Sequence, residues 1–87
     1  MQIVFHRNFK KSFKKRIQGN RKLELKFKQR LVLYLKDPNS PLLKVHRLKG
    51  VKREYWSFSV TGDIRVIFKM DGQILRLYDV GTHNQVY

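Results

Sequence analysis

The C-terminal stretch from Val51 to Tyr87 constrains the fold most, because two turn signals divide it into three apolar runs. The first signal is Thr61-Gly62-Asp63 and the second is Asp71-Gly72. An Asp-Gly pair between apolar runs is typical of a tight β-hairpin, because a type I′ turn needs positive φ at both central residues. We therefore predict a three-stranded antiparallel meander over residues 55–60, 64–70 and 74–80, followed by a short polar tail.

Side chains alternate along the first two predicted strands, and successive side chains of a strand point to opposite faces of a sheet. One face carries Trp56, Phe58, Val60, Ile64, Val66, Phe68 and Met70, and the other carries Tyr55, Ser57, Ser59, Arg65, Ile67 and Lys69. The first face needs a cover, whereas the second can meet water or a ligand. The register of residues 74–80 stays open, because Leu75 and Leu77 oppose Ile74, Arg76 and Tyr78.

Two amphipathic helices are predicted before the meander. The first has Asn8 as its N-terminal cap and an apolar stripe of Phe9, Phe13 and Ile17 at i, i+4 and i+8. Gly19-Asn20 ends it, and a second helix follows over about residues 21–36. The stripe of the second helix is Leu23, Phe27, Leu31 and Tyr34 or Leu35, and the prolines at positions 38 and 41 end it.

These elements predict an α+β fold. The apolar stripes of the two helices and the apolar face of the sheet are all buried if a two-helix N-terminal hairpin packs on one face of a small, mainly antiparallel β-sheet. Residues 2–5 are expected to add a further strand. The 87 residues suffice for one modest core, so we predict a single domain over residues 1–87.

The net charge of +14, from 20 Lys and Arg against 6 Asp and Glu, indicates a polyanionic partner. Nucleic acid, an anionic membrane and an acidic protein all fit this charge. The chain has no cysteine, which excludes disulfides and thiolate metal sites and suits the reducing cytoplasm. Neither a transmembrane segment nor a secretory signal is visible in it, so we expect a cytoplasmic protein without a membrane partner.

Five residues near the predicted strand ends carry possible chemistry: His46, Asp63, Arg65, His83 and Tyr87. This set suits RNA cleavage by the RNA's own 2′-hydroxyl, which needs a base, an acid and positive charge on the phosphorane. Imidazole can serve as base or acid near neutral pH, and an arginine stabilises charge without proton transfer. We expect no metal and no other cofactor, because no carboxylate cluster suited to two metal ions is visible.

The expected roles follow from position. Arg65 stabilises the phosphate from a strand, His83 acts as general acid or base, and Tyr87 orients or stacks a base. His46 and Asp63 are auxiliary, with Asp63 orienting a histidine. Each residue has a structural alternative: a solvated histidine, a turn-stabilising aspartate at position 63, an ion pair of Arg65 with Asp79, or Tyr87 as a packing anchor.

Cations outside this set fall into two groups. Those of the two helices lie mainly opposite the apolar stripes, and a solvated helix face explains most of them. The cations between the second helix and the meander are better placed to line the polar sheet face. We predict that this second group binds RNA through Lys44, Lys49, Lys52 and Arg53.

From about Leu43 to Tyr87 the chain resembles the RelE/YafQ-like ribonucleases, small bacterial toxins of type II toxin–antitoxin systems. The matching pieces are Lys44-Val45-His46, Leu48, Gly50, Tyr55, Asp63-Ile64-Arg65-Val66-Ile67-Phe68, Gly81-Thr82-His83 and the terminal aromatic Tyr87. The two preceding helices match in kind and length, so the resemblance covers nearly the whole chain.

The resemblance implies a cytoplasmic endoribonuclease that cleaves mRNA, usually in the ribosomal A site, and is held inactive by a cognate antitoxin, expected here to be acidic. The YafQ-like site maps onto His46, Asp63, His83 and Tyr87, and the RelE-like site maps onto Arg65 and Tyr87. The chain departs from the YafQ pattern in the first meander strand, where Ser59 stands in place of a histidine. It departs again at Ile64, which follows Asp63, and at Asn84 and Gln85, which follow His83.

Two other functions compete with a metal-independent endoribonuclease. A ParE-like toxin of the same fold would bind DNA gyrase without cutting RNA, but such chains generally lack the His/Arg/Tyr set. A non-catalytic RNA-binding module would stack bases on exposed aromatics, for which Tyr55, Tyr78 and Tyr87 are available.

Overall fold

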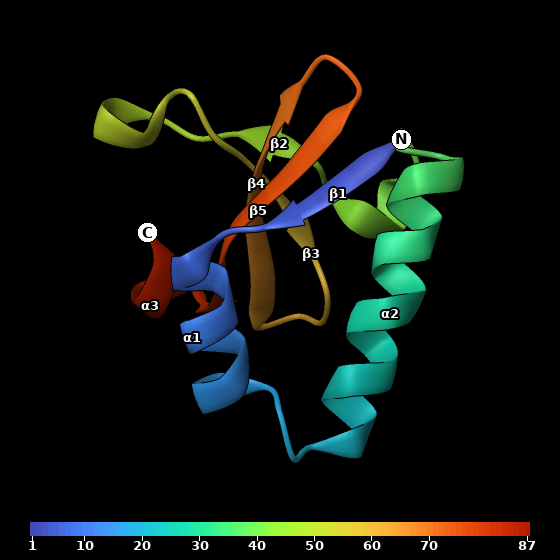
Figure 1. Cartoon of the computed structure of the whole chain (residues 1–87), viewed down its shortest axis with the longest axis vertical. Helices are drawn as coiled ribbons and strands as arrows, with labels where there is room; N and C mark the ends of the chain where they lie inside the picture. The colour runs from blue at the N-terminus through green and yellow to red at the C-terminus, as the bar shows by residue number, and fades with distance from the viewer.

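A five-stranded sheet forms the centre of the structure, a computed structural model that describes residues 1–87. The strands are β1 (Gln2–Phe5), β2 (His46–Arg47), β3 (Trp56–Ser59), β4 (Ile64–Asp71) and β5 (Ile74–Thr82). They lie in the order β1-β5-β4-β3-β2, with β1 parallel to β5 and every other pair antiparallel (Figure 1). The meander and the N-terminal strand are therefore confirmed.

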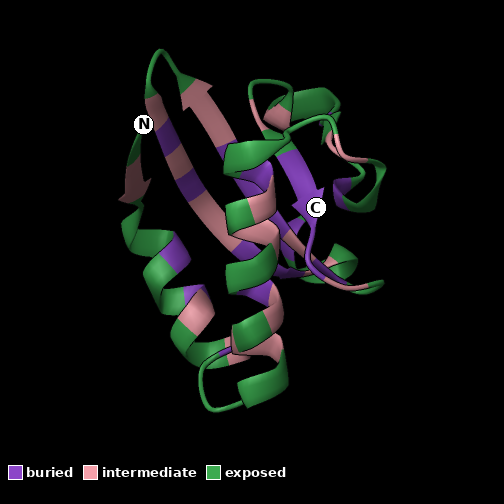
Figure 2. Ribbon diagram, turned by 90° about the vertical axis from the view of Figure 1, so that its right-hand side faces the viewer, coloured by how far each residue is buried: buried purple, intermediate pink, exposed green.

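Two long helices cover one face of this sheet, as Figures 1 and 2 show. They are α1 (Arg7–Arg16) and α2 (Arg21–Lys36), followed by the short 3-10 helices η1 (Pro41–Leu43) and η2 (Gly50–Lys52). The predicted α+β fold with a helical hairpin on a mainly antiparallel sheet is confirmed. None of the helices combines the length and the hydropathy needed to cross a membrane.

The N-terminal cap of helix α1 lies two residues earlier than predicted. Its cap is His6, whose Nδ1 accepts from the Asn8 backbone N–H at 3.4 Å, so the expected Asn8 cap is wrong. The Asn8 side chain instead donates to the Tyr78 carbonyl at 3.0 Å. The break at Gly19-Asn20 is confirmed: Gly19 has φ +92° and the Asn20 side chain caps α2.

The predicted polar tail contains a further helix that we did not predict, because residues 83–86 form α3 (His83–Val86). Thr82 and Gln85 cap it reciprocally, and the Thr82 backbone N–H donates to Gln85 Oε1 at 2.8 Å. A helix of one turn is too short to give a periodic sequence pattern, which is why the sequence did not reveal it.

The hairpin between β4 and β5 differs from the predicted type I′ turn. Asp71 is the last residue of β4 and pairs with Ile74, so the loop consists of Gly72 and Gln73. Only Gly72 has positive φ, at +61°. A glycine at the first loop position is the arrangement of a type II′ hairpin, which suits twisted strands equally well.

A bulge explains why the register of β5 stayed open. Phe68 pairs with Leu77 but Ile67 pairs with Asp79, so Tyr78 is an extra residue in β5. The bulge shifts the alternation by one residue, and both Leu77 and Val80 reach the core although they are three residues apart.

The main core lies between the two long helices and the sheet. The Tyr34 ring of α2 packs against Phe58 and Phe68, with centroids 5.7 and 4.9 Å apart. Trp56, which we placed on this core face, is 39% exposed. It lies at the start of β3 in a groove lined by Tyr34 of α2 and by Pro38 and Asn39 of the segment that follows this helix.

The pH dependence of stability tests the packing of Tyr34. Burial raises the pKa of the Tyr34 phenol above its usual range, because the charged phenolate is poorly solvated there. A raised pKa in the folded state stabilises the fold below the unfolded-state pKa of about 10 and is lost as the pH rises through the folded-state value. We expect the free energy of unfolding to fall above pH 10 in the wild type, and to fall less in Tyr34→Phe. Urea unfolding of both proteins below and above pH 10 measures this difference. An equal loss of unfolding free energy in the two proteins would contradict the prediction.

Candidate active site

The second face of the sheet is covered in part by α3. Val86 of this helix is fully buried and packs with Leu48 and Ile67 in a small apolar cluster separate from the main core. Because Val86 anchors α3, the residues at its two ends, His83 and Tyr87, are held over this face of the sheet. The face that we expected to meet a ligand therefore carries the C-terminal helix and the site.

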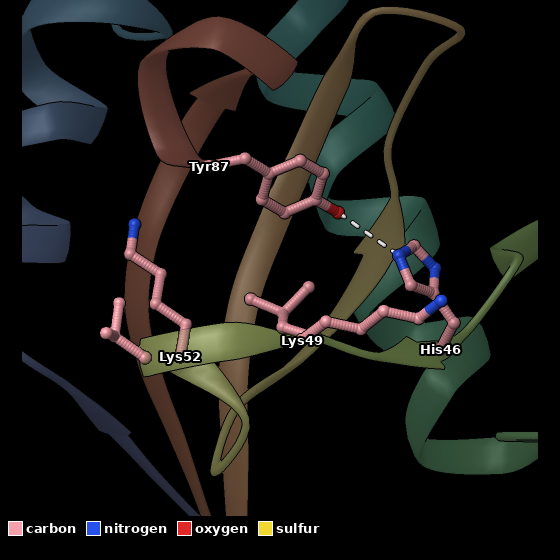
Figure 3. A pocket seen from close by; sticks show the side chains of 6 residues that line it. His46, Lys49, Lys52 and Tyr87 are labelled. Atoms are coloured by element: carbon pink, nitrogen blue, oxygen red, sulfur yellow. Dashed lines mark hydrogen bonds between the residues drawn. The ribbon is translucent and has the colours of Figure 1, made fainter.

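Tyr87 lies at the centre of the candidate site. Its hydroxyl donates to Ser57 Oγ at 2.8 Å and lies 3.4 Å from Nε2 of His46 (Figure 3). The Tyr87 side chain is half-buried, with 38% of the residue exposed. The last residue of the chain is thus tied to β2 and β3, which are more than 25 residues away in sequence.

His46 is positioned by the short strand β2, where it pairs with Ser57 of β3. Its Nδ1 lies 3.1 Å from the Lys44 carbonyl, and its ring nitrogens lie 3.4 and 3.5 Å from Ser57 Oγ. The tautomer with a proton on Nδ1 donates to that carbonyl and leaves Nε2 free to accept a proton. His46 is exposed, so a substrate can reach this nitrogen.

His83 and Arg65 contact the same tyrosine from other elements. The His83 ring, at the start of α3, stands edge-on to the Tyr87 ring with centroids 4.4 Å apart. The Arg65 guanidinium carbon, from β4, lies 6.0 Å from the centre of the Tyr87 ring. The structure therefore brings together four of the five predicted residues: His46, Arg65, His83 and Tyr87.

Arg65 has an unusual environment. Its Nε is buried and no protein group accepts a hydrogen bond from it. The alternative pairing of Arg65 with Asp79 does not occur, because Asp79 pairs with Arg16 of α1 at 3.4 Å. A buried donor without a partner is costly, and no carboxylate of the protein pairs with this guanidinium.

Asp63 is the predicted residue that the structure does not bring into the cluster. Its carboxylate makes no hydrogen bond and no ion pair, and its backbone N–H donates to Thr61 Oγ1 at 3.2 Å in the turn before β4. The residue is exposed. Ser59, where the YafQ pattern has a histidine, also stays outside the cluster, because its hydroxyl donates to the Thr61 carbonyl at 2.6 Å.

The four predicted RNA-binding cations lie around the His46–Tyr87 pocket in different ways. Lys49 and Lys52 line this pocket of about 350 Å³ together with His46, Leu48, Val51 and Tyr87. Figure 3 shows the Lys49 side chain extending towards His46, whereas Lys52 turns towards the C-terminal helix and donates to the Val86 carbonyl. Lys44 and Arg53 are exposed on the flanking segments.

Ser57 is the site residue that sequence reasoning missed. The alternation placed it on the polar face, but nothing in the sequence indicated that β2 pairs with it and places its hydroxyl between His46 and Tyr87. Two imidazoles, a phenol and an unpaired guanidinium thus converge, a set that can transfer protons and bind a phosphate. No three His, Cys, Asp or Glu side chains gather in an arrangement that would hold a metal ion.

Known structures resemble this fold closely. YafQ from E. coli strain BL21(DE3) matches with a TM-score of 0.84 and 25% identity, covering 99% of this chain and 97% of that one. The E. coli DinJ-YafQ toxin-antitoxin complex matches with a TM-score of 0.81 and 25% identity, over 99% and 96% of the two chains. A YoeB/ParE toxin from Agrobacterium tumefaciens shares the fold at 20% identity, with a TM-score of 0.79 over 95% and 99%.

A sequence comparison agrees with these structures. No curated protein matches the chain. The family model described as the bacterial toxin of type II toxin-antitoxin system, YafQ, matches residues 1–87. Because this model spans the whole chain, the protein belongs to the YafQ family of bacterial type II toxin–antitoxin toxins.

Proposed function

We propose that this toxin is a metal-independent endoribonuclease that cleaves mRNA by attack of the 2′-hydroxyl on the adjacent phosphate. The observation that carries the proposal is the contact of His46, His83 and Arg65 with the single residue Tyr87. A site of this kind supplies a base, an acid and a fixed positive charge within the reach of one nucleotide.

The reaction has two proton transfers. A base removes the proton of the 2′-hydroxyl, the oxygen attacks phosphorus, and an acid protonates the departing 5′-oxygen. The products are a 2′,3′-cyclic phosphate and a 5′-hydroxyl. Arg65 stabilises the extra negative charge of the phosphorane with a guanidinium that β4 holds in place and that no carboxylate of the protein neutralises.

The two histidines divide the proton transfers between them. His83 is exposed on α3 and remains the principal acid or base. His46 is more than auxiliary in this geometry, because its Nε2 lies 3.4 Å from the Tyr87 hydroxyl and faces the same pocket. We assign the second transfer to His46, and we assign Tyr87 to orienting the nucleotide with its half-exposed ring.

A cognate acidic antitoxin is the second partner in this proposal. The toxin carries a net charge of +14, and related toxins have been solved as the DinJ-YafQ complex and as the YoeB-YefM complex from Staphylococcus aureus. An acidic antitoxin neutralises this charge and covers the basic surface until it is removed. We further propose that the free toxin acts in the cytoplasm on ribosome-bound mRNA.

Incubation with RNA in EDTA tests the nuclease proposal. We expect the purified toxin to cut ribosome-free mRNA at the same rate in Mg²⁺ and in EDTA, and ribosome-bound mRNA in Mg²⁺, because EDTA dissociates ribosomes. The products should carry 2′,3′-cyclic or 3′-phosphate ends and 5′-hydroxyl ends, which mass spectrometry of the fragments measures. Cleavage of ribosome-free mRNA that stops in EDTA, or 5′-phosphate products, would contradict the mechanism, and the absence of cleavage in both the ribosome-free and the ribosome-bound reactions would contradict the function.

The salt dependence of RNA binding tests the predicted cations. Lys49 and Arg53 are exposed, so the double variant Lys49→Ala/Arg53→Ala should fold normally and bind single-stranded RNA more weakly. Loss of two phosphate contacts should flatten the slope of log K against log salt by about 1.4. The matched control is Lys22→Ala/Lys28→Ala on the exposed surface of α2, which removes the same charge and should leave the slope unchanged. If only the control variant binds RNA more weakly, the RNA contacts the helix lysines and not Lys49 and Arg53.

A further inference from the structure

A second cleft, of about 220 Å³, opens on the same face of the sheet and shares Lys52 with the His46–Tyr87 pocket. It is lined mainly by His6, Lys52, Tyr55, Tyr78, Asp79 and Val86. The proposed catalytic assignments use none of its aromatic residues, although Tyr55 and Tyr78 were available for base stacking in the alternative of an RNA-binding module. The hydrogen bond from Lys52 to the Val86 carbonyl forms the border between the two cavities.

Three aromatic rings form a continuous surface in this cleft. The Tyr78 ring lies 4.7 Å from the His6 ring at an angle of 35°, and 4.8 Å from the Tyr55 ring at 70°. Both tyrosines are half-buried, and neither hydroxyl makes a hydrogen bond within the protein. The bulge in β5 is what places Tyr78 here, because it breaks the alternation of the strand at this residue.

The polar groups of the cleft are arranged for a base rather than for a phosphate. Asp79 uses Oδ1 for Arg16 and for the Val80 N–H, at 3.4 and 2.9 Å, so Oδ2 is left as an acceptor. A carboxylate repels a phosphate but accepts hydrogen bonds from the exocyclic amine of a base. The cation at the border, Lys52, keeps donors free for a phosphate at the entrance.

We propose that this cleft binds a nucleobase of the RNA substrate that flanks the scissile bond, with the RNA backbone crossing Lys52 between the two cavities. This proposal rests on the proposed function, because it extends the substrate path of the same site. The base packs against the aromatic surface that His6, Tyr78 and Tyr55 form together. The Asp79 carboxylate favours adenine, cytosine or guanine, which carry an exocyclic amine, over uracil.

Position-specific fluorescence tests the proposal on the intact toxin. The probe is a set of short RNAs with 2′-O-methyl riboses, which cannot be cleaved, each carrying one 2-aminopurine. We expect the fluorescence to be quenched by the toxin at one position outside the scissile pair, and Tyr78→Leu to abolish this quenching and weaken binding about tenfold. Tyr55→Leu should have a smaller effect in the same direction, and uracil at that position should weaken binding of the wild type.

The control variant is Trp56→Leu, which removes an exposed aromatic from the opposite face of the sheet, next to Tyr55 in the sequence, and should change neither signal. Circular dichroism and the NMR spectrum of each variant establish that it is folded. Should Tyr78→Leu fold but quench like the wild type, or should no position be quenched, the inference is wrong. Weaker binding of the acidic antitoxin with unchanged RNA binding would assign the cleft to the protein partner and would also overturn it.

The same measurements separate this inference from the nuclease proposal. If the wild type cleaves unmodified RNA but shows no Tyr78-dependent quenching, the nuclease function stands and the base-binding cleft does not. If the quenching depends on Tyr78 but unmodified RNA is never cleaved, the cleft stands and the nuclease function does not.

Discussion

We expect the replacement of Arg65 with Ala to lower the rate of RNA cleavage by about 10²- to 10³-fold, the usual loss when one preorganised charge-stabilising donor is removed. The guanidinium is fixed on β4, lies 6.0 Å from the Tyr87 ring centre, and has a buried Nε without a protein acceptor. Because the proposed role of this positive charge is to stabilise the transition state, the loss should appear in kcat more than in KM. Single-turnover cleavage of a fluorescent RNA measures it.

Two variants control for this loss. Arg65→Lys keeps the charge but not the planar donor arrangement, so we expect it to recover only part of the activity. Arg76→Ala removes an arginine of β5 that pairs with Asp71 at the far hairpin, and it should retain wild-type activity. If Arg65→Ala were as active as Arg76→Ala, Arg65 would have no role in stabilising the phosphorane.

We expect the replacement of His83 with Ala to lower cleavage by about 10²-fold or more, because one positioned acid or base typically contributes 10²- to 10⁴-fold. The His83 ring stands edge-on against the Tyr87 ring, and the His46 Nε2 lies 3.4 Å from the Tyr87 hydroxyl. An acid and a base acting together give a bell-shaped dependence of kcat/KM on pH, and the single variants should each lose one limb. The pH profiles of His83→Ala and His46→Ala measure this.

The two histidine variants also test each other. If both imidazoles act in one reaction, the double variant should lose much less than the product of the two single losses. Both single variants should remain folded and bind the antitoxin, because both side chains are exposed. Wild-type activity in His83→Ala would refute its assignment, and an unchanged pH profile in His46→Ala would return that residue to an auxiliary role.

The local elements of this toxin could be predicted from the sequence because their signals are short-range. The apolar stripe around Phe9 and Ile17, the break at Gly19-Asn20 and the alternation around Phe58 each depend on neighbouring residues. The helical hairpin, the meander and the fold class were therefore correctly predicted. Residue chemistry and the family resemblance also selected a set of five residues, His46, Asp63, Arg65, His83 and Tyr87, of which all but Asp63 lie together in the structure.

Only the tertiary structure decided which of these residues meet. The contact of Tyr87 with Ser57 and His46 depends on the pairing of a two-residue strand and on a one-turn helix, and neither leaves a periodic pattern in the sequence. The bulge at Tyr78 shifts β5 by one residue and sends Asp79 to Arg16 rather than to Arg65. Such contacts form between residues far apart in the chain, where strand register and packing, not local propensity, set the geometry.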